Sequence, residues 1–378
     1  MRRFRFAVLV IFLLLIGVGL FWLGGELTRP IPPTPNITPS PAPTRVGSGN
    51  GLIAFTSDRD GNFEIYVMNA DGSNQRNLTQ NEAWDNRPAW SPDGTQIVFT
   101  SSRLGEFNPE IFIMNADGSD VRQITHNSSV NEVIWSPIGT QLLMTQYSFL
   151  QNNTPVIQPA LVQLDGTVQP LIMPEEARNA ICHSPQWSPD GSHVAFICFQ
   201  FATSVLYSLA PDGSSAVKVS SHVNAFAWSP DGTKLAWRSN GNLWLAEANG
   251  DNQHLMRMDL GGTFADLLLW SPDSTRLLLS SADEYQIRRL FLMWADGSNL
   301  TQLPAPLADS FPADFFSVGD TANFAPANDW IAFTADYGNV NTLYALNISE
   351  AFRDPASLAP IQLTTSGADF GPRWQPQP

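Results

Sequence analysis

The sequence has only two cysteines, few charged residues and none of the short motifs that mark common enzyme classes. Charged residues are 15% of the chain, below the roughly 25% that is usual in globular domains. It contains no Gly-x-Ser-x-Gly, His-Glu-x-x-His, Cys-x-x-Cys, phosphate-binding loop or dinucleotide fingerprint. We therefore predict no catalytic residues, no metal site and no cofactor, and we expect a protein that is not an enzyme.

Basic residues are also scarce. The chain has 20 Lys and Arg against 35 Asp and Glu, a net charge of −15. Such a surface is repelled by phosphate backbones, so nucleic acid is excluded as a partner.

A tryptophan followed by a proline turn recurs along the chain at intervals of 41 to 54 residues. The copies are Trp90-Ser-Pro-Asp-Gly94, Trp135-Ser-Pro-Ile-Gly139, Trp187-Ser-Pro-Asp-Gly191, Trp228-Ser-Pro-Asp-Gly232, Trp270-Ser-Pro-Asp-Ser274, Phe324-Ala-Pro-Ala-Asn328 and Trp374-Gln-Pro-Gln-Pro378. Short strands repeated at this period are typical of a β-propeller. The seven copies predict an all-β, seven-bladed β-propeller, with six blades as the alternative.

Each repeat predicts a strand ending at the Trp, a tight turn and two further apolar strands, then a short outer strand. The second strands are predicted at Leu52–Ser57, Gln96–Ser101, Gln141–Gln146, His193–Cys198, Lys234–Ser239, Arg276–Ser281 and Trp330–Ala335. The chain enters the repeats at a second strand and ends on an anchor. We therefore expect the last strand to complete the sheet that begins at Leu52.

The pattern Pro-x-Trp-Ser-Pro-Asp-Gly, followed by two apolar strands, Asp-Gly and Leu-Thr, resembles the TolB-like family of β-propeller repeats. Residues 51–90 and 96–135 match it closely, and the resemblance spans about residues 51 to 374. It implies a propeller at residues 51–378 whose funnel region is where partner chains dock. Nothing in the chain matches the separate N-terminal α/β domain of TolB.

The N-terminal residues predict a membrane anchor and a stalk. Residues 6–25 carry no charge, and as a helix they would be roughly 30 Å long. Three arginines precede them, which places the N-terminus in the cytoplasm and the propeller outside it, in a bacterial envelope. Residues 1–25 are then a cytoplasmic tip and transmembrane signal anchor, with a cleaved signal peptide as the alternative. Residues 26–50 hold seven prolines and predict an extended linker.

Cys182 and Cys198 lie on either side of one predicted hairpin turn. They could face each other across the hairpin, and outside the cytoplasm such a pair favours a disulfide. Two buried thiols in separate strands are the alternative.

The candidate site is a ring of polar residues, each four positions before an anchor, where the innermost strands begin. The ring consists of Asn86, Asn131, His183, Asn224, Asp266 and Asp320, with Phe370 as the apolar seventh position. Convergent amides and carboxylates could bind a peptide, a sugar or a cation, although residues around a water-filled channel are polar in any case.

Two further segments are weaker candidates. Asp58, Asp60 and Glu64 loosely resemble a calcium loop, but they lack its full spacing and fit a hairpin better. The insertion Pro304–Asp320 carries three phenylalanines, which could form a contact surface or pack against the sheet edge.

Two functions remain open. The first is a membrane-anchored, non-catalytic scaffold that binds a protein or peptide at its funnel face. The alternative is a carbohydrate-binding or carbohydrate-active propeller, for which Asp266, Asp320, Asp85 and Asp369 are the available acids.

Overall fold

The computed structural model describes residues 51–105, 108–150, 152–200, 203–248, 250–257, 267–282, 288–304, 322–337 and 340–376. The chain divides into two compact units, residues 1–44 with 313–315 and residues 45–312 with 316–378. The described residues all belong to the second unit. The predicted anchor, the linker, Asp266, Asp320 and most of the 304–320 insertion lie outside them.

The described residues fold into six antiparallel-rich sheets with no α-helix. No helix among these residues is long and apolar enough to cross a membrane.

Five of the sheets have four strands each. The first joins β28 (Asp369–Trp374), β1 (Leu52–Ser57), β2 (Glu64–Asn69) and β3 (Arg76–Asn77); the second joins β4 (Asp85–Trp90), β5 (Gln96–Ser101), β6 (Glu110–Asn115) and β7 (Arg122–Gln123). The third joins β16 (Val223–Trp228), β17 (Lys234–Ser239), β18 (Asn242–Glu247) and β19 (His254–Arg257). The fourth joins β20 (Leu268–Trp270), β21 (Arg276–Ala282), β22 (Arg288–Trp294) and β23 (Thr301–Gln302). The fifth joins β24 (Ala322–Phe324), β25 (Trp330–Tyr337), β26 (Val340–Asn347) and β27 (Ile361–Gln362).

The sixth sheet has eight strands because two four-stranded meanders are joined. One meander is β8 (Val130–Trp135), β9 (Gln141–Phe149), β10 (Pro155–Gln163) and β11 (Val168–Pro170); the other is β12 (Ile181–Trp187), β13 (Val194–Gln200), β14 (Thr203–Leu209) and β15 (Val217–Ser221). A single parallel bridge between Ile157 and Ile181 connects them. The 3-10 turns Glu175–Ala177 and Pro355–Ser357 lie in loops.

The predicted strands agree closely with the observed ones. β1, β5 and β17 have the predicted bounds, and β9, β13, β21 and β25 differ from prediction by one to three residues at an end. The expected closure is also confirmed, because β28 pairs with β1 through Ile53 and Trp374. Strands from the two ends of the propeller sequence therefore share one sheet.

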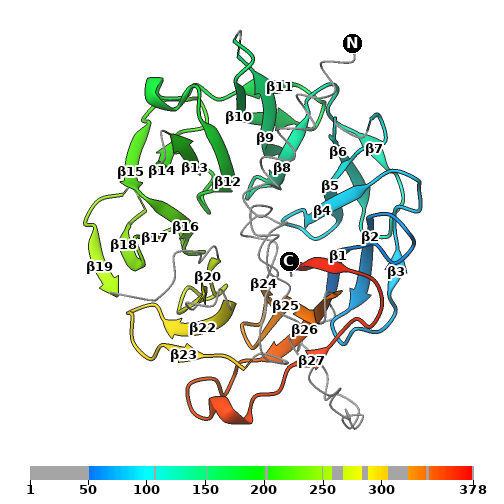
Figure 1. The fold of residues 1–378 in the computed structure, drawn as a ribbon, viewed down its shortest axis with the longest axis vertical. Coiled ribbons are helices and arrows are strands. Elements are labelled where there is room, and N and C mark those ends of the chain that lie inside the picture. Colours follow the sequence, from blue (N-terminus) through cyan, green and yellow to red (C-terminus); the bar gives the residue numbers. More distant parts are fainter. Residues whose placement is uncertain are drawn as a thin grey trace, which may run out of the picture. The chain divides into compact units, whose positions relative to one another are not determined.

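The strand that ends at each anchor is the innermost strand of its sheet (Figure 1). These strands contact each other in series, from β24 to β28, β4, β8, β12, β16 and β20. The sheets of β20 and β24 also meet, since Leu278 and Leu292 share one apolar cluster with Phe324 and Phe333.

The anchor tryptophans link neighbouring sheets. The indole Nε1 of Trp90 donates to the carbonyl of Arg373 at 3.0 Å, that of Trp135 to Ala89 at 3.2 Å, and that of Trp270 to Ala227 at 3.0 Å. In each case the acceptor is the residue just before the anchor of the preceding innermost strand. Three of the anchor tryptophans therefore repeat one contact between sheets, whereas the Nε1 atoms of Trp187, Trp228 and Trp374 have no hydrogen-bond partner among the described residues.

The turn after the anchor is fixed by its serine and aspartate. Ser188 Oγ donates to Asp190 at 2.6 Å and accepts from the backbone N–H of His193 at 2.9 Å. Ser229 and Asp231 repeat the first of these contacts. Hydrogen bonds from Ser188 and from the Ser192 backbone lower the pKa of Asp190 to about 2, against the opposing effect of burial.

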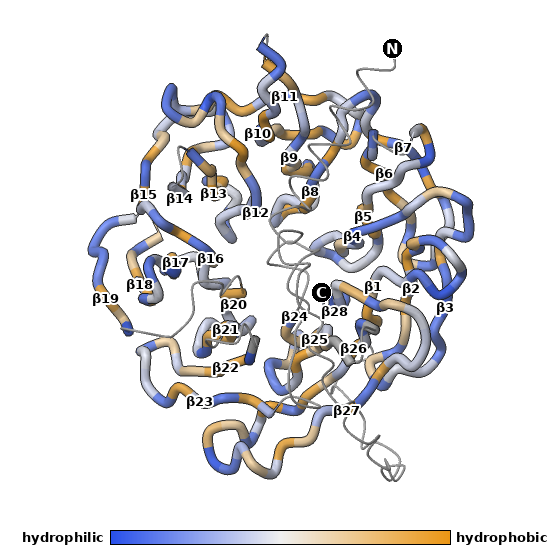
Figure 2. The backbone as a smooth tube through the Cα atoms, viewed as in Figure 1, coloured by the Kyte–Doolittle hydropathy of each residue, from blue (hydrophilic) through white to orange (hydrophobic). Residues whose placement is uncertain are grey.

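The core lies between adjacent sheets. Ala54 and Ile65 of one sheet pack in a single cluster with Ile97, Phe99 and Met114 of the next. Figure 2 shows hydrophobic residues along the middle strands, whereas the outer strand β3 is hydrophilic. Burial on both faces explains why the second and third strands are continuous apolar runs.

Candidate functional site

A cavity of about 460 Å³ lies among the innermost strands. Its walls come from β4, β8, β12, β20 and β28 and from the turns that follow the first two anchors. The polar or charged side chains among its lining residues are Arg87, Glu132, Ser136, Ser184, Gln186 and Arg373. The indoles of Trp90, Trp135 and Trp187 belong to the same lining, so the cavity combines an aromatic wall with a few polar groups.

Backbone bulges set the direction of the cavity residues. The pairing of β4 with β5 shifts between Asn86 and Ala89, and that of β12 with β13 shifts between His183 and Gln186. Within these bulges Arg87 has a φ of 57° and Ser184 a φ of 53°. Both residues stand three positions before an anchor and directly before a proline. A bulge re-aims a side chain and often occurs next to a functional site.

Glu132 is the carboxylate of this wall. Its side chain accepts a hydrogen bond from the backbone N–H of Ser184 at 2.9 Å, and the residue is only 8% exposed. Burial raises the pKa of the nearby Tyr147, and the charges of Arg87 and Glu132 act on the same pKa in opposite directions. The two charged residues are therefore within electrostatic reach of one phenol.

Four members of the sequence-predicted ring are described, and each is the second or third residue of an innermost strand. Asn86, Asn131, His183 and Asn224 are half-buried. The Nδ2 of Asn131 donates to Thr145 at 3.4 Å, and His183 shares a 3.0 Å hydrogen bond with Ser184. The buried Oδ1 of Asn86 has no partner among the described residues.

None of these four residues lines the cavity. The next residue along three of these strands does so: Arg87, Glu132 and Ser184. The predicted ring was defined by its distance of four residues from each anchor, whereas the cavity lining begins one residue later, within or beside a bulge. A proline two positions before the anchor marks the bulges of β4, β12 and β28, and this signal was present in the sequence.

The buried acids named for carbohydrate chemistry have structural partners. Asp85 pairs with Arg103 at 2.9 Å, and Asp369 pairs with Arg59 at 2.8 Å. Each guanidinium also stacks over two aromatic rings, Arg103 over Phe99 and Phe112. These acids hold innermost strands to their own sheets and do not line the cavity.

The weak calcium-loop candidate behaves as a hairpin. Asp58 accepts from the Ala368 backbone at 2.6 Å, Asp60 from Asn77 at 2.8 Å, and Glu64 from the Asn81 backbone at 2.9 Å. The three carboxylates thus serve different neighbours. No group of three His, Cys, Asp or Glu able to hold a metal occurs within the described residues.

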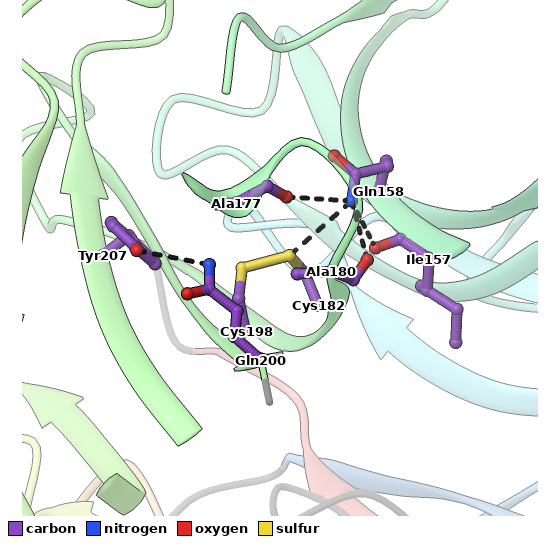
Figure 3. The surroundings of a disulfide bond; sticks show 8 residues. All are labelled: Ile157, Gln158, Ala177, Ala180, Cys182, Cys198, Gln200 and Tyr207. Carbon is purple, nitrogen blue, oxygen red and sulfur yellow. Dashed lines mark hydrogen bonds between the residues drawn. A yellow bond between two sulfur atoms is a disulfide. The ribbon is translucent and has the colours of Figure 1, made fainter. Parts of the chain in front are cut away.

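The expected disulfide is present. Cys182 of β12 and Cys198 of β13 are directly paired, bonded and completely buried. Figure 3 shows Gln158 pointing toward Cys182, with its Nε2 at 4.0 Å from the sulfur, and Gln200 pointing toward the Tyr207 hydroxyl. Cys182 lies two residues before Ser184 of the cavity lining, so the bridge joins the strand that carries Ser184 to β13.

Comparison with known proteins gives partial matches. A family described as TolB beta propeller domain matches residues 35–160. An uncharacterised protein of Agrobacterium fabrum, Atu1656, is 31% identical over 158 residues, which cover 38% of this chain and 50% of that protein. The Tol-Pal system protein TolB of Desulfosudis oleivorans is 45% identical over 53 residues, or 14% of this chain and 12% of that protein.

A relative named as a peptidase also matches part of the chain. Dipeptidyl-peptidase 5 of Porphyromonas gingivalis is 32% identical over 198 residues, covering 51% of this chain and 27% of that protein. The chain thus spans at most half the length of these three curated relatives.

Two solved structures share the fold. TolB from Acinetobacter baumannii has a TM-score of 0.55 at 16% identity, covering 87% of this chain and 68% of that one. Oligogalacturonate lyase from Vibrio parahaemolyticus has a TM-score of 0.63 at 16% identity, covering 81% and 88%.

Proposed function

The chain is a TolB-like β-propeller, and from this premise we propose that it is a non-catalytic scaffold that binds a protein or peptide at its innermost strands. The observation that carries this proposal is the cavity, in which residues from five innermost strands converge. A concave site with an aromatic wall and a few polar groups is the usual form of a binding pocket.

In this proposal the six sheets act as seven blades. The eight-stranded sheet supplies two of them, because each of its meanders begins with an innermost strand and contains one anchor, Trp135 or Trp187. The polar ring of Asn86, Asn131, His183, Asn224, Asp266 and Asp320 then forms the mouth through which the partner enters. The Asn86 Oδ1 without a partner among the described residues supports a role for this edge.

We further propose that residues 1–25 anchor the protein in the membrane and that residues 26–50 hold the propeller outside the cytoplasm. The uncharged run of residues 6–25 and the buried disulfide support an extracytoplasmic location. In a fractionation experiment, the full-length protein should need detergent for extraction, and protease added to intact spheroplasts should degrade the propeller. Release by carbonate alone would contradict the anchor.

The binding function can be tested with the protein solubilised from its own membranes. Tagged wild-type protein and the variants Asn86→Ala, Asn131→Ala and Asp266→Ala are used to capture partners, which are identified by mass spectrometry. We expect at least one protein whose recovery falls about 10-fold in these variants, since each can lose a hydrogen bond to a buried partner group.

The matched control is Asn115→Ala, which removes the same amide from the β6–β7 turn, away from the innermost strands. Equal recovery with all variants, or no partner at all, would contradict a binding role for the mouth.

A carbohydrate ligand is the alternative. Among the described residues, Glu132 is the only carboxylate of the cavity lining, and Asp85 and Asp369 are committed to arginines. A glycan array probed with the wild-type protein separates the two functions. Glycan binding that depends on the mouth residues would favour the carbohydrate function.

A further inference from the structure

Arg87 occupies a backbone conformation that favours glycine. Its φ is 57°, and the same position three residues before the anchor has a φ of 53° at Ser184 and 59° at Gly371. For a residue with a Cβ, this left-handed backbone conformation destabilises the folded state by on the order of 1 kcal/mol. β28 avoids that cost with its glycine, whereas β4 retains an arginine. Backbone strain that persists next to a cavity motivates the hypothesis of a functional role for the side chain.

Arg87 forms no ion pair among the described residues, although Glu132 belongs to the same cavity lining. The Nη1 of Arg87 donates to the backbone carbonyl of Asn131. By contrast, Arg59 and Arg103 each pair with a buried aspartate. Arg87 is thus a cavity guanidinium with no ion-pair partner in the described part of a chain whose net charge is −15.

The rest of the cavity strengthens an interaction at this guanidinium. Three indoles and two prolines that precede anchors surround it with apolar surface, and charge-assisted hydrogen bonds are stronger in such surroundings. Arg373 brings a second guanidinium-bearing residue to the lining. The acidic exterior has little influence here, because salt screens exposed charges beyond about 10 Å.

We propose that Arg87 binds a carboxylate of an acidic peptide segment within the cavity. This inference rests on the proposed peptide-binding function and names the chemical group that the site recognises. A guanidinium matches the planar carboxylate with two parallel hydrogen bonds. A cavity of about 460 Å³ admits an acidic side chain with its neighbours.

Synthetic pentapeptides test the proposal by isothermal titration calorimetry with the propeller. The first has a central glutamate and blocked ends, the second replaces glutamate by glutamine, and the third is neutral with a free carboxyl end. Trigalacturonate is the fourth probe. The first and third peptides distinguish a side-chain carboxylate from a terminal one. We expect the glutamate peptide to bind at least about 10-fold more tightly than its glutamine counterpart.

The variants Arg87→Gly and Arg87→Gln should lose this preference by about the same factor. Arg87→Gly should also melt at an equal or higher temperature than the wild type, because glycine removes the backbone strain. That combination separates a binding role from a structural one. Arg353→Ala is the matched control: it also removes one positive charge, but from an arginine side chain that is 83% exposed.

The outcomes distinguish this inference from the function on which it rests. If glutamate and glutamine peptides bind equally, and Arg87→Gly changes neither, the inference is overturned and peptide binding stands. If no peptide binds, both are overturned. Binding of trigalacturonate alone overturns the peptide ligand in favour of a carbohydrate acid, and a lower melting temperature of Arg87→Gly overturns the strain argument.

Discussion

Cys182 and Cys198 face each other at the register position that Asp85 and Ser101 occupy in the second sheet. Cys182 and Asp85 each lie five positions before their anchor tryptophan. Cys198 and Ser101 each lie four positions after the residue that pairs with that tryptophan. Asp369 and Ser57 repeat the arrangement in the sheet that closes the chain. At one position in the repeat, a covalent bond in one sheet therefore corresponds to a buried ion pair in two others.

Removal of the disulfide should destabilise the propeller. For Cys182→Ala with Cys198→Ala we expect a loss of about 3 kcal/mol, the value typical of a bridge that closes a loop of this length. Urea unfolding followed by tryptophan fluorescence measures it. Reduction of the wild type should give a loss of similar size, and an unchanged midpoint after complete reduction would contradict a stabilising bridge.

Replacing the disulfide by the ion pair of the other two sheets tests whether the two arrangements are equivalent. Gln200 stands where the other sheets have Arg103 or Arg59, two residues beyond the strand position in question. Cys182→Asp with Cys198→Ser should be less stable than the double alanine variant, because the aspartate is buried without a cation. Addition of Gln200→Arg should recover part of that loss. Failure of the arginine to recover any stability would show that the three sheets are not interchangeable here.

The inter-sheet indole hydrogen bond should have a measurable effect. Trp90→Phe removes the donor to the Arg373 carbonyl, whereas the Nε1 of Trp187 has no partner among the described residues. Both changes remove a similar volume from sites of equal burial. We expect Trp90→Phe to cost about 1 kcal/mol more than Trp187→Phe in chemical unfolding. Equal losses would show that the Trp90 contact stabilises through packing alone.

Closure by β28 predicts a strong effect of truncation. Loss of residues 369–378 exposes the β1 edge, removes Trp374 from an apolar cluster and leaves Arg59 without Asp369. We expect thermal unfolding to become broad and to begin at lower temperature. Removal of residues 377 and 378 alone is the control, since β28 ends at Trp374. A sharp transition at the wild-type temperature after the longer deletion would contradict closure.

The turn aspartates predict a dependence of stability on pH. The folded-state pKa of Asp190 is lowered to about 2 from 3.8, so its contribution is present above pH 4 and is lost as the pH falls toward 2. The difference in urea midpoint between wild type and Asp190→Asn should therefore shrink over that range. Ile138 occupies the equivalent turn position, so Ile138→Asn should show no such dependence. A difference independent of pH would contradict this role of Asp190.

The repeat made most of the strand arrangement predictable. Each anchor fixes a turn through local contacts, such as Ser229 with Asp231, and the strands on either side follow from continuous apolar runs. The length of β9 was underestimated because residues 147–149 carry mixed polarity. Their pairing depends on the partner strand rather than on their own pattern.

The site was less predictable, because it depends on irregular backbone. Counting back four positions from Trp90 or Trp187 reaches the innermost strand, but the residues that line the cavity begin one position later, inside a bulge that the repeat spacing does not specify. The sequence also could not show that Arg87 differs from Arg59 and Arg103 in having no ion-pair partner among the described residues. Asp369, the partner of Arg59, lies far along the chain, and Asp85, the partner of Arg103, lies on the adjacent strand of its sheet.

The parallel bridge between Ile157 and Ile181 makes the third and fourth meanders a single hydrogen-bonded body. Amide protons on both sides of that seam should exchange with solvent at a common, slow rate, while elsewhere each meander opens on its own. Local opening then begins away from the disulfide, at the interfaces where side-chain packing and isolated hydrogen bonds, such as Asp85 N–H to the Phe63 carbonyl, join one sheet to the next without strand pairing.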